Sequence, residues 1–379
     1  MTRLLFVCNC PAFFVSHRLP IAEACIAAGY DVHVATATTD AGALAAITRV
    51  GAQHHGLLLD RSGTHPLHEA RTFAQIFRLI HQLRPKILHL VTIKPVLYGG
   101  LAARVLGTPC RVAAISGMGH LFINEDRGIP RRLLEWAYRS ALKHPNGRVI
   151  VQNPTDRDAL RKLHSMPEEH NLLIPGSGVD LKTFTQAPLP TDAPQIVVMP
   201  ARMLWTKGVG EFVAAARELR RQGVSARFVL VGPHDPHNPA GIPLEQLECW
   251  RENADVEWWG HRQDMPDVLA KATLVVLPSY REGLPKCLIE AAAVGRPIIT
   301  TDTPGCRDTV NPGETGVLVP PRDAGALARA MGQLLSQPDK LRSMGRQARI
   351  KAEREFGLPR VVKRHLEIYE QLMAATGES

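Results

Sequence analysis

Short apolar runs alternate with helix-like segments along the chain, and the alternation falls into two blocks. Runs that are apolar throughout are typical of strands buried on both faces of a parallel sheet. Strands joined by helices in this order predict an α/β fold in which helices cover parallel sheets. The expected strands begin at Leu4 and near Asp31 and then cover 87–91, 111–115 and 149–152 in the first block, and 196–200, 227–231, 256–258, 274–277, 298–301 and 317–319 in the second.

A proline-rich stretch separates the two blocks. Residues 186–194 contain three prolines, which neither a helix nor a central strand tolerates, and they are predicted to form a linker. We therefore expect a first domain over 1–185 and a second over 195–358. A final helix is predicted over 359–379, where apolar residues recur at helical spacing: Val362, Leu366, Tyr369 and Met373.

The composition is that of a soluble protein with more than one core. The chain has 379 residues, of which 45% are apolar and 21% charged. No apolar stretch approaches the roughly 18 residues that span a bilayer. The run from Leu4 to Val15 resembles the core of a signal peptide, but it continues into a helix ending at Ala28 and a further strand. We therefore expect this run to be a sheet strand.

No metal site and no disulfide framework are expected. Seven cysteines are scattered through the expected strands and helices, which indicates reduced thiols in a cytosolic setting. Cys8 and Cys10, even with His17, do not supply four tetrahedral ligands. The D-x-D string of Asp156 and Asp158 opens a helix, where acidic residues stabilise the positive end of the helix dipole.

The positive charge is concentrated in the first half of the chain. In residues 1–180, 20 Lys and Arg against 13 Asp and Glu give +7, whereas 25 against 23 give +2 for the rest. Nucleic acid is not expected as a partner, because aromatic residues make up 5% and no basic stripe interleaves with them. The stretch 127–144 has a composition that suits an anionic membrane surface, and equally an amphipathic helix packed on its own sheet. It combines cations with apolar residues: Arg131, Arg132, Arg139, Lys143, Leu134, Trp136, Tyr138 and Leu142.

Two carboxylates bracket a strand-to-helix loop in the second block. Glu282 follows the expected strand 274–277, and Glu290 lies eight positions later in the small-residue helix 288–294. Ligands of parallel sheets bind where loops leave the carboxyl ends of the strands, so Glu282 is expected in a ligand crevice. The alternative is a solvated loop glutamate and a helix-surface glutamate that share a spacing.

The backbone between these carboxylates favours an anion. Gly283 allows close approach to a ligand, and Pro285 suits a first helical turn. The N–H groups from Lys286 to Leu288 would then point at an anionic guest. Since a helix rises about 1.5 Å per residue, Glu290 stands roughly 6 Å deeper than Lys286. The two carboxylates could hold hydroxyls on either side of a diphosphate, in the order sugar, diphosphate and ribose.

A second strand-to-helix loop carries two cations. Arg202 and Lys207 follow the expected strand 196–200 and precede a helix over 209–220. A diphosphate leaving group needs such charges, because negative charge develops on its bridging oxygen as the glycosidic bond breaks. Two surface cations would look the same in sequence, since Arg202 could be a snorkelling residue after an apolar strand.

The segment 282–290 resembles the E-x7-E motif of the retaining glycosyltransferases of family 4, and Arg202 with Lys207 resembles the Arg/Lys pair of that family. The resemblance implies the GT-B fold, with two Rossmann-like domains facing a central cleft. It implies that Glu282 hydrogen-bonds the donor sugar and Glu290 the ribose hydroxyls. The other donor-binding residues that it implies are Gly283, Leu284, Pro285, Lys286 and, where the base docks, His261.

The resemblance extends beyond these motifs. The segment 174–184 resembles the stretch where members of the family cross between domains, and the helix 359–379 would return to the first domain. The segment 9–16 stands where members often carry a Gly-Gly loop, so a close backbone contact to the donor phosphate is not assured there. Ser16 and His17, at its end, are assigned to the acceptor.

Two loops of the first block resemble family members that extend polyprenyl-diphosphate-linked sugars, including the N-acetylgalactosaminyltransferase type. These loops are 93–100 and 116–122, each at the end of an expected strand. The resemblance places Lys94 at the acceptor diphosphate. Many members have a histidine where this chain has Ser116, and His120 is expected to take over its catalytic role near the donor sugar. A surface lysine and a plain loop histidine are the alternatives.

The resemblance implies transfer of a sugar from a UDP-sugar to a polyprenyl-diphosphate-linked glycan in bacterial surface-polysaccharide or glycoprotein assembly, with an N-acetylhexosamine as the expected sugar. The leaving phosphate would take the acceptor proton, so neither a protein nucleophile nor a metal or other cofactor is needed. The protein would work in the cytoplasm, docked on the inner face of the membrane. The alternative functions are a nucleotide-sugar epimerase, a phosphorylase and a non-catalytic sugar-nucleotide-binding subunit. An NAD dehydrogenase is a poor rival, because each Gly-x-Gly segment lacks the third glycine.

Overall fold

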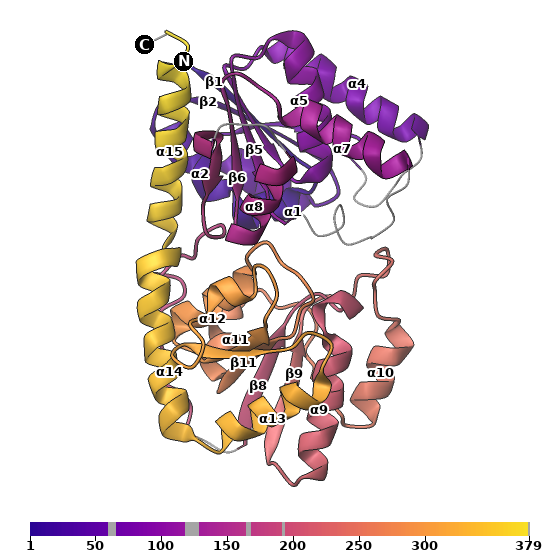
Figure 1. Cartoon of the computed structure of the whole chain (residues 1–379), viewed down its shortest axis with the longest axis vertical. Helices are drawn as coiled ribbons and strands as arrows, with labels where there is room; N and C mark the ends of the chain where they lie inside the picture. Colours follow the sequence, from indigo (N-terminus) through magenta and orange to yellow (C-terminus); the bar gives the residue numbers. More distant parts are fainter. Residues whose placement is uncertain (60–65, 118–128, 164–167, 192–193, 378–379) are drawn as a thin grey trace. The chain divides into compact units, whose positions relative to one another are not determined.

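The computed structural model describes residues 1–59, 66–117, 129–163, 168–191 and 194–377. The chain divides into two compact units, one comprising Met1–Ser177 with Pro359–Ser379 and the other Gly178–Leu358. Each unit contains one parallel β-sheet packed between helices (Figure 1). The predicted α/β class with two Rossmann-like domains is confirmed.

The described part of the first unit forms a seven-stranded sheet in the order β3-β2-β1-β4-β5-β6-β7. Five of its strands were expected from the sequence. The other two, β3 and β7, span four and three residues, and β3 reads Gln-His-His-Gly, so neither gives an apolar run. The strands are β1 (Arg3–Cys8), β2 (Asp31–Thr36), β3 (Gln53–Gly56), β4 (Ile87–Val91), β5 (Cys110–Ile115), β6 (Gly147–Val151) and β7 (Asn171–Leu173).

Helices cover both faces of this sheet, and the alternation of side chains along β1 separates two cores. Phe6 packs with α1, α2, α3 and α15, whereas Leu5 and Val7 pack with α4, α5, α7 and α8 on the other face. The helices are α1 (Pro11–His17), α2 (Leu19–Ala27), α3 (Ala41–Arg49), α4 (Pro66–Leu83), α5 (Ile93–Leu106), α7 (Ile129–Leu142), α8 (Pro154–Leu163) and α15 (Leu358–Ala374), with a 3-10 turn at Glu168–His170.

The C-terminal helix α15 packs in the first unit. Ile368 and Leu372 are fully buried in its core. The hydroxyl of Tyr369 lies 2.5 Å from Nδ1 of His89 on β4, and Asn146 Nδ2 donates to the carbonyl of Leu372 at 2.9 Å. The expected helix is therefore present, although its most buried stripe lies about one residue before three of the four positions that the spacing indicated.

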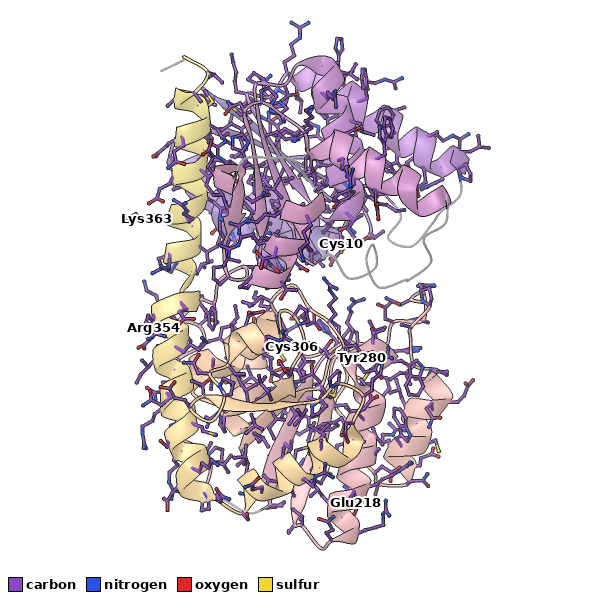
Figure 2. All side chains as sticks on the ribbon, in the orientation of Figure 1. Cys10, Glu218, Tyr280, Cys306, Arg354 and Lys363 are labelled. Atoms are coloured by element: carbon purple, nitrogen blue, oxygen red, sulfur yellow. The ribbon has the colours of Figure 1, made fainter. Side chains whose placement is uncertain are left out.

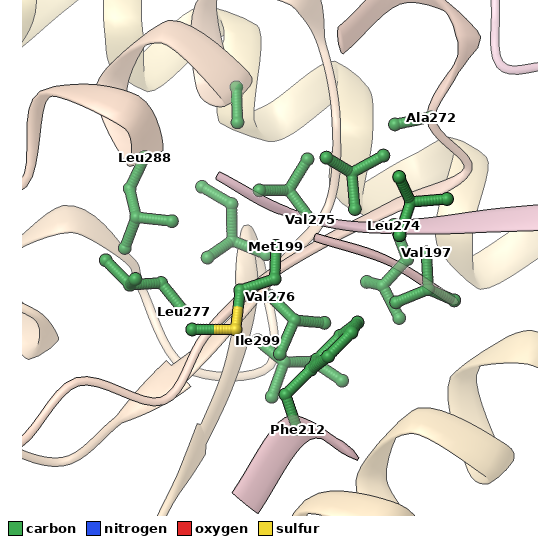
Figure 3. Close-up of a cluster of buried hydrophobic side chains, with 14 of the residues drawn as sticks. Val197, Met199, Phe212, Ala272, Leu274, Val275, Val276, Leu277, Leu288 and Ile299 are labelled. Carbon is green, nitrogen blue, oxygen red and sulfur yellow. The ribbon is translucent and has the colours of Figure 1, made fainter. Parts of the chain in front are cut away.

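The second unit contains a six-stranded sheet in the order β10-β9-β8-β11-β12-β13. All its expected strands are present: β8 (Gln195–Pro200), β9 (Ala226–Val231), β10 (Glu257–Trp258), β11 (Leu274–Leu277), β12 (Ile298–Thr301) and β13 (Gly316–Val319). Val197 and Met199 of β8 belong to its core together with Val276 of β11 and Phe212 of α9 (Figure 3). The helices are α9 (Val209–Arg221), α10 (Leu244–Glu252), α11 (Met265–Lys271), α12 (Lys286–Val294), α13 (Ala324–Leu335) and α14 (Pro338–Lys351), with 3-10 turns at Trp205–Lys207 and Arg307–Thr309 and a π-helical turn at Ala352–Phe356.

The proline-rich segment 186–194 packs on the second unit where it is described. Arg296, which is fully buried, donates through Nη2 to the carbonyls of Ala187 at 3.2 Å and Pro188 at 2.9 Å. The division between units falls after Ser177 rather than after residue 185. Composition alone did not reveal this packing, because it depends on a guanidinium more than 100 residues away in the sequence.

Candidate functional site

The order of strands in the second unit brings the two sequence motifs to one edge of the sheet. β8 is flanked by β9 on one side and β11 on the other, so the chain winds in opposite directions from β8. Loops that leave the carboxyl ends of two such strands diverge and open a crevice between them. Arg202 and Lys207 follow β8, and Glu282 follows β11, so all three belong to the loops at this switch point.

Backbone contacts lock these two loops together. The amide of Tyr280 donates to the carbonyl of Thr206 at 3.0 Å. Gly208, at a φ of +78°, lies so close to Pro278 that a Cβ placed on it would be 2.2 Å from the proline carbonyl oxygen. Only glycine fits this close approach at a positive φ. The 3-10 turn that carries Lys207 is thereby held against the strand end that precedes Glu282.

Lys207 and Glu282 form an ion pair in the second unit, Nζ to Oε1. Their side chains are 20% and 14% exposed, so each can still reach a ligand. The loop after β12 supports Glu282. The amide of Glu282 donates to the carbonyl of Pro304 at 3.1 Å, and a Cβ on Gly305 would lie 2.4 Å from the carbonyl oxygen of Glu282. The structure thus brings together the cation and the carboxylate that the sequence placed in separate motifs.

Glu290 lies one turn into α12, behind Lys286. The Nζ of Lys286 is 3.5 Å from Oε1 of Glu290, which is 9% exposed. Burial raises the pKa of the Glu290 carboxyl above its usual range, and the charge of Lys286 opposes that shift. The first turn of α12 holds no acidic residue, and the side chain of its N-cap Pro285 makes no capping bond. A helix N-terminus of this kind attracts an anion.

Two cysteine thiols lie close to the carboxylates of Glu282 and Glu290. Burial raises the pKa of Cys287, and the charges of Glu282 and Glu290 add to that effect, whereas Lys207 opposes it. Burial likewise raises the pKa of Cys306 to about 11, with Glu282 contributing. Both thiols are therefore neutral near pH 7 and supply no nucleophile.

Arg202 is held by a residue that the sequence interpretation missed. Its Nη1 lies 2.6 Å from Oδ2 of Asp235, in the loop after β9. The signal was present in the sequence, because Asp235 follows an apolar strand just as Glu282 does. Arg202 is therefore fixed at the same edge of the sheet as Lys207, but through a different carboxylate.

A second unanticipated group lies at this edge. Tyr280 donates from its hydroxyl to Glu211 Oε1 at 2.6 Å, and the guanidinium carbon of Arg322 sits 4.7 Å from the centre of its ring. Burial raises the pKa of Tyr280 to about 12, and the hydrogen bond to Glu211 adds to this effect. Tyr280 and Cys306 both appear at the same end of the second unit (Figure 2).

His261 stands apart from the charged group. It is exposed and follows β10, the edge strand, which lies two strands from β8. Neighbouring strands are about 4.8 Å apart, so β10 and β8 are separated by about 10 Å. Gly283 and Leu284 do lie in the Glu282 loop, and Leu284 is 6% exposed. The base-docking role of His261 stays a prediction.

The first unit has a pocket at its own switch point, where β1 is flanked by β2 and β4. The pocket has a volume of about 350 Å³, and Lys94 is one of its lining residues. The Nζ of Lys94 lies 2.7 Å from Oε1 of Glu69 on α4. The other carboxylate oxygen of Glu69 accepts from the hydroxyl of Tyr98 at 2.5 Å. Glu69 was not anticipated, because nothing in the sequence links it to Lys94.

The remaining acceptor residues lie beside this pocket or outside the described residues. The ring of His17 stacks on Phe13, a lining residue, with centroids 4.0 Å apart, and Ser16 Oγ lies 2.5 Å from His17 Nδ1. His17 and Ser16 are not themselves among the lining residues. His120, the expected catalytic histidine, lies outside the described residues.

The D-x-D string belongs to a helix start. The amide of Asp156 donates to Oδ1 of Asn153 at 2.8 Å, and Asn153 Nδ2 donates back to the carboxylate of Asp156 at 3.0 Å. This reciprocal pair begins α8 and accounts for the buried position of Asp156. Within the described residues, no group of three or more His, Cys, Asp or Glu side chains could hold a metal ion.

Each of the two units matches a known protein family. Residues 3–152 match the family "Glycosyl transferase 4-like", and residues 194–337 match the family "Glycosyl transferases group 1". The chain is 27% identical over 329 residues to the N,N'-diacetylbacillosaminyl-diphospho-undecaprenol alpha-1,3-N-acetylgalactosaminyltransferase of Campylobacter jejuni, covering 83% of this chain and 84% of that protein.

Two further proteins are similar over most of their length. The UDP-Gal:alpha-D-GlcNAc-diphosphoundecaprenol alpha-1,3-galactosyltransferase of Escherichia coli is 23% identical over 79% of each chain. The crystal structure of Anabaena Alr3699/HepE in complex with UDP matches with a TM-score of 0.78 and 16% identity, covering 98% of this chain and 100% of that one. The second similarity is one of fold.

Proposed function

Because this chain belongs to the glycosyltransferases with the GT-B fold, with a 4-like and a group 1 domain, we propose that it transfers a sugar from a UDP-sugar to a polyprenyl-diphosphate-linked glycan. The observation that carries the donor half is the cluster of Lys207, Glu282 and Glu290 around the N-terminus of α12. The acceptor half is supported by the names of two relatives, both of which act on diphospho-undecaprenol-linked sugars. An N-acetylhexosamine is the proposed donor sugar, for bacterial surface-polysaccharide or glycoprotein assembly.

The cluster suits a nucleotide diphosphate sugar. The diphosphate would lie at the N-terminus of α12, with the Lys207 ammonium stabilising the negative charge of the leaving phosphate. Glu282, which already orients Lys207, has a second carboxylate oxygen with which it can accept from a sugar hydroxyl. Glu290 lies deeper along the helix, where it would accept from the ribose. Arg202, fixed by Asp235, would add a second cation.

We further propose that transfer retains the anomeric configuration and requires no divalent metal. The leaving phosphate would take the proton of the acceptor hydroxyl, so that the bond to the new oxygen forms on the face from which UDP departs. Lys207 and the helix N-terminus would then neutralise the negative charge of the diphosphate, as a metal ion does in other diphosphate sites.

The first test is direct. The purified protein is incubated with each of UDP-GlcNAc, UDP-GalNAc, UDP-glucose and UDP-galactose and a short-chain polyprenyl diphosphate bearing an acetamido sugar. Mass spectrometry should find one added hexose or N-acetylhexosamine, and NMR should find an α linkage from an α donor. Activity should persist in EDTA. Epimerised or phosphorolysed donor without a glycan product would refute the proposal, and so would UDP binding without turnover.

We also propose that the first unit docks on an anionic membrane surface to reach this acceptor. Trp136 on α7 is 63% exposed, and Arg139 and Lys143, three and seven residues further on, are exposed on the same face. Tyr138 and Leu142 are buried and pack in the core, so α7 is both an amphipathic core helix and a carrier of exposed cations. The side chains of Arg131 and Arg132 lie outside the described residues. No helix in the described ranges is long and apolar enough to cross a bilayer.

A further inference from the structure

The pocket of the first unit differs in its lining from the charged site of the second unit. Its volume of about 350 Å³ lies at the small end of the range of roughly 300 to 1,000 Å³ for small-molecule sites, which suits one sugar residue better than a whole nucleotide sugar. Phe13, Cys10 and Ile93 give it apolar walls. Its one charged lining residue among the described ones, Lys94, is already neutralised by Glu69.

Two hydroxyls in this wall lack hydrogen bonds. Thr92 follows β4 and Ser116 follows β5, and both residues line the pocket. The hydroxyl oxygens of both are buried and have no hydrogen-bond partner among the described residues. An unpaired buried hydroxyl costs free energy, so two in one small pocket call for an explanation. A ligand that brings its own donors and acceptors into the pocket supplies one.

Thr92 is also held in an unfavourable backbone conformation. Its φ of +74° and ψ of 170° fall in a region essentially restricted to glycine. Threonine at the N-cap of a helix normally accepts a bond from the first turn, but the Thr92 side chain makes no such bond with α5. The strain and the missing cap together show that the position does not serve helix capping.

Resting on the proposed function, we propose that Thr92 and Ser116 bind hydroxyl groups of a sugar ring in this pocket. A hydroxyl both donates and accepts, which matches another hydroxyl, whereas a phosphate offers only acceptors. The apolar walls suit the C–H face of the ring. The sugar is either the terminal residue of the glycan acceptor or the sugar of the donor.

The test removes each hydroxyl without changing shape. Thr92→Val keeps the β-branch and therefore the backbone strain, and Ser116→Ala removes only the oxygen. Each lost hydrogen bond of about 0.5 to 1.5 kcal/mol should raise KM by about 2- to 13-fold. Thr92→Ser, which retains the hydroxyl, should keep the KM of the wild type.

The choice of substrate distinguishes the two sources of the sugar. If the pocket holds the acceptor sugar, KM for the polyprenyl diphosphate sugar rises and KM for the UDP-sugar does not. If it holds the donor sugar, KM for the UDP-sugar rises while the Kd of UDP itself stays constant. Either result supports the proposal, and unchanged KM values for both substrates in the double variant overturn it.

Stability provides an independent readout. Since the two hydroxyls are unpaired, Thr92→Val and Ser116→Ala should leave Tm unchanged or raise it. The matched control is Thr72→Val on α4, where the buried hydroxyl donates to the carbonyls of Leu58 and His68. That change should lower Tm and leave both KM values unchanged. A drop in Tm for Thr92→Val as large as the drop for Thr72→Val would mean that the hydroxyl is structural, and would overturn the proposal.

A failure of the proposed function can be separated from a failure of this inference. If the wild type transfers no sugar, saturation-transfer NMR with the methyl α-glycoside of N-acetylglucosamine still tests the pocket. Signals from the glycoside with the wild type, lost in the double variant, support the sugar site. No signal with the wild type, or an equal signal with the double variant, overturns it.

Discussion

The two units have their sites at the same point of the same kind of sheet, the switch point, but different side chains line them. In the second unit the switch point is lined by carboxylates and cations that pair with one another: Lys207 with Glu282, and Arg202 with Asp235. In the first unit the described lining of the corresponding pocket has one ion pair, apolar walls and two hydroxyls without partners. The same kind of sheet thus carries a charged cluster in one unit and a largely apolar pocket in the other.

The two sites are held in place by different interactions. The paired side chains hold one another in position, and a diphosphate could replace Glu282 as the partner of Lys207. Unpaired hydroxyls need no exchange of partners but leave the empty pocket less stable. The charged site of the second unit should therefore respond to removal of charge, and the pocket of the first unit to removal of hydrogen-bonding groups.

The largest expected effect is on Lys207. Lys207→Ala removes the cation nearest the diphosphate, and a hydrogen bond to a charged group contributes about 1.5 to 3 kcal/mol. The value of kcat/KM should fall by roughly 10- to 150-fold, and further if the contact strengthens in the transition state. Steady-state transfer assays measure this, with Lys340→Ala, an exposed lysine of α14, as the control. Activity within a factor of two of wild type would remove Lys207 from the site.

The next effect concerns the glycine that holds the two loops. Gly208→Ala places a Cβ 2.2 Å from a backbone oxygen at a φ of +78°. Gly223 has the same φ of +78° but nothing within 4 Å of its Cβ position, so Gly223→Ala carries the backbone strain alone. Strain costs of order 1 to 3 kcal/mol, and Gly208→Ala should lower the free energy of unfolding by clearly more.

Urea unfolding of both variants separates the clash from the strain. Equal losses in stability would mean that the loops after β8 and β11 can part without cost. The charged site would then be less rigid than its backbone contacts imply.

Membrane docking tests whether the first unit meets a lipid-linked acceptor. Trp136→Ala combined with Arg139→Glu and Lys143→Glu should weaken binding to vesicles of anionic phospholipid, since each basic residue near such a surface contributes about 1 kcal/mol. Losing two predicts roughly 30-fold weaker binding at low salt, with a smaller difference at high salt.

A matched variant on α14 controls for net charge. Ile350→Ala with Lys340→Glu and Arg346→Glu changes the same kinds of exposed residue in the second unit. Co-sedimentation of this variant should match the wild type. If the α7 variant binds as well as the wild type, or the wild type ignores anionic vesicles, a soluble acceptor becomes the better proposal.

The smallest effect is a pH dependence from Glu290. Its pKa is raised in the folded state above the usual 4.5 because the carboxyl is buried. As pH rises above about 4.5, the unfolded state ionises first, so this group lowers the free energy of unfolding until pH passes the folded pKa. The slope is at most about 1.4 kcal/mol per pH unit for one proton. The Glu290→Gln variant has no carboxyl to titrate at this position. Its free energy of unfolding, relative to that of the wild type, should therefore rise as pH increases from about 4.5 to the folded pKa. Parallel urea midpoints from pH 4.5 to 8 would contradict the assignment.

Local signals in the sequence specify the alternation of strands and helices and the loops that hold the motifs. Apolar runs and turn residues are local signals, so they located 11 of the 13 strands in the described chain, and missed β3 and β7, which are short and polar or partly exposed. The spacing of Glu282 and Glu290 and the placement of Lys207 after a strand were likewise visible. These positions follow from the rule that ligands lie at the carboxyl ends of parallel strands.

Which side chains meet depends on the packing of elements that are distant in the sequence. The partners Lys207 and Glu282 are separated by 75 residues, Arg202 and Asp235 by 33, and Lys94 and Glu69 by 25. Such pairs depend on the order of strands in each sheet, which no local periodicity reports. The unpaired hydroxyls of Thr92 and Ser116 are of the same kind, because whether a hydroxyl finds a partner is settled only when distant elements pack around it.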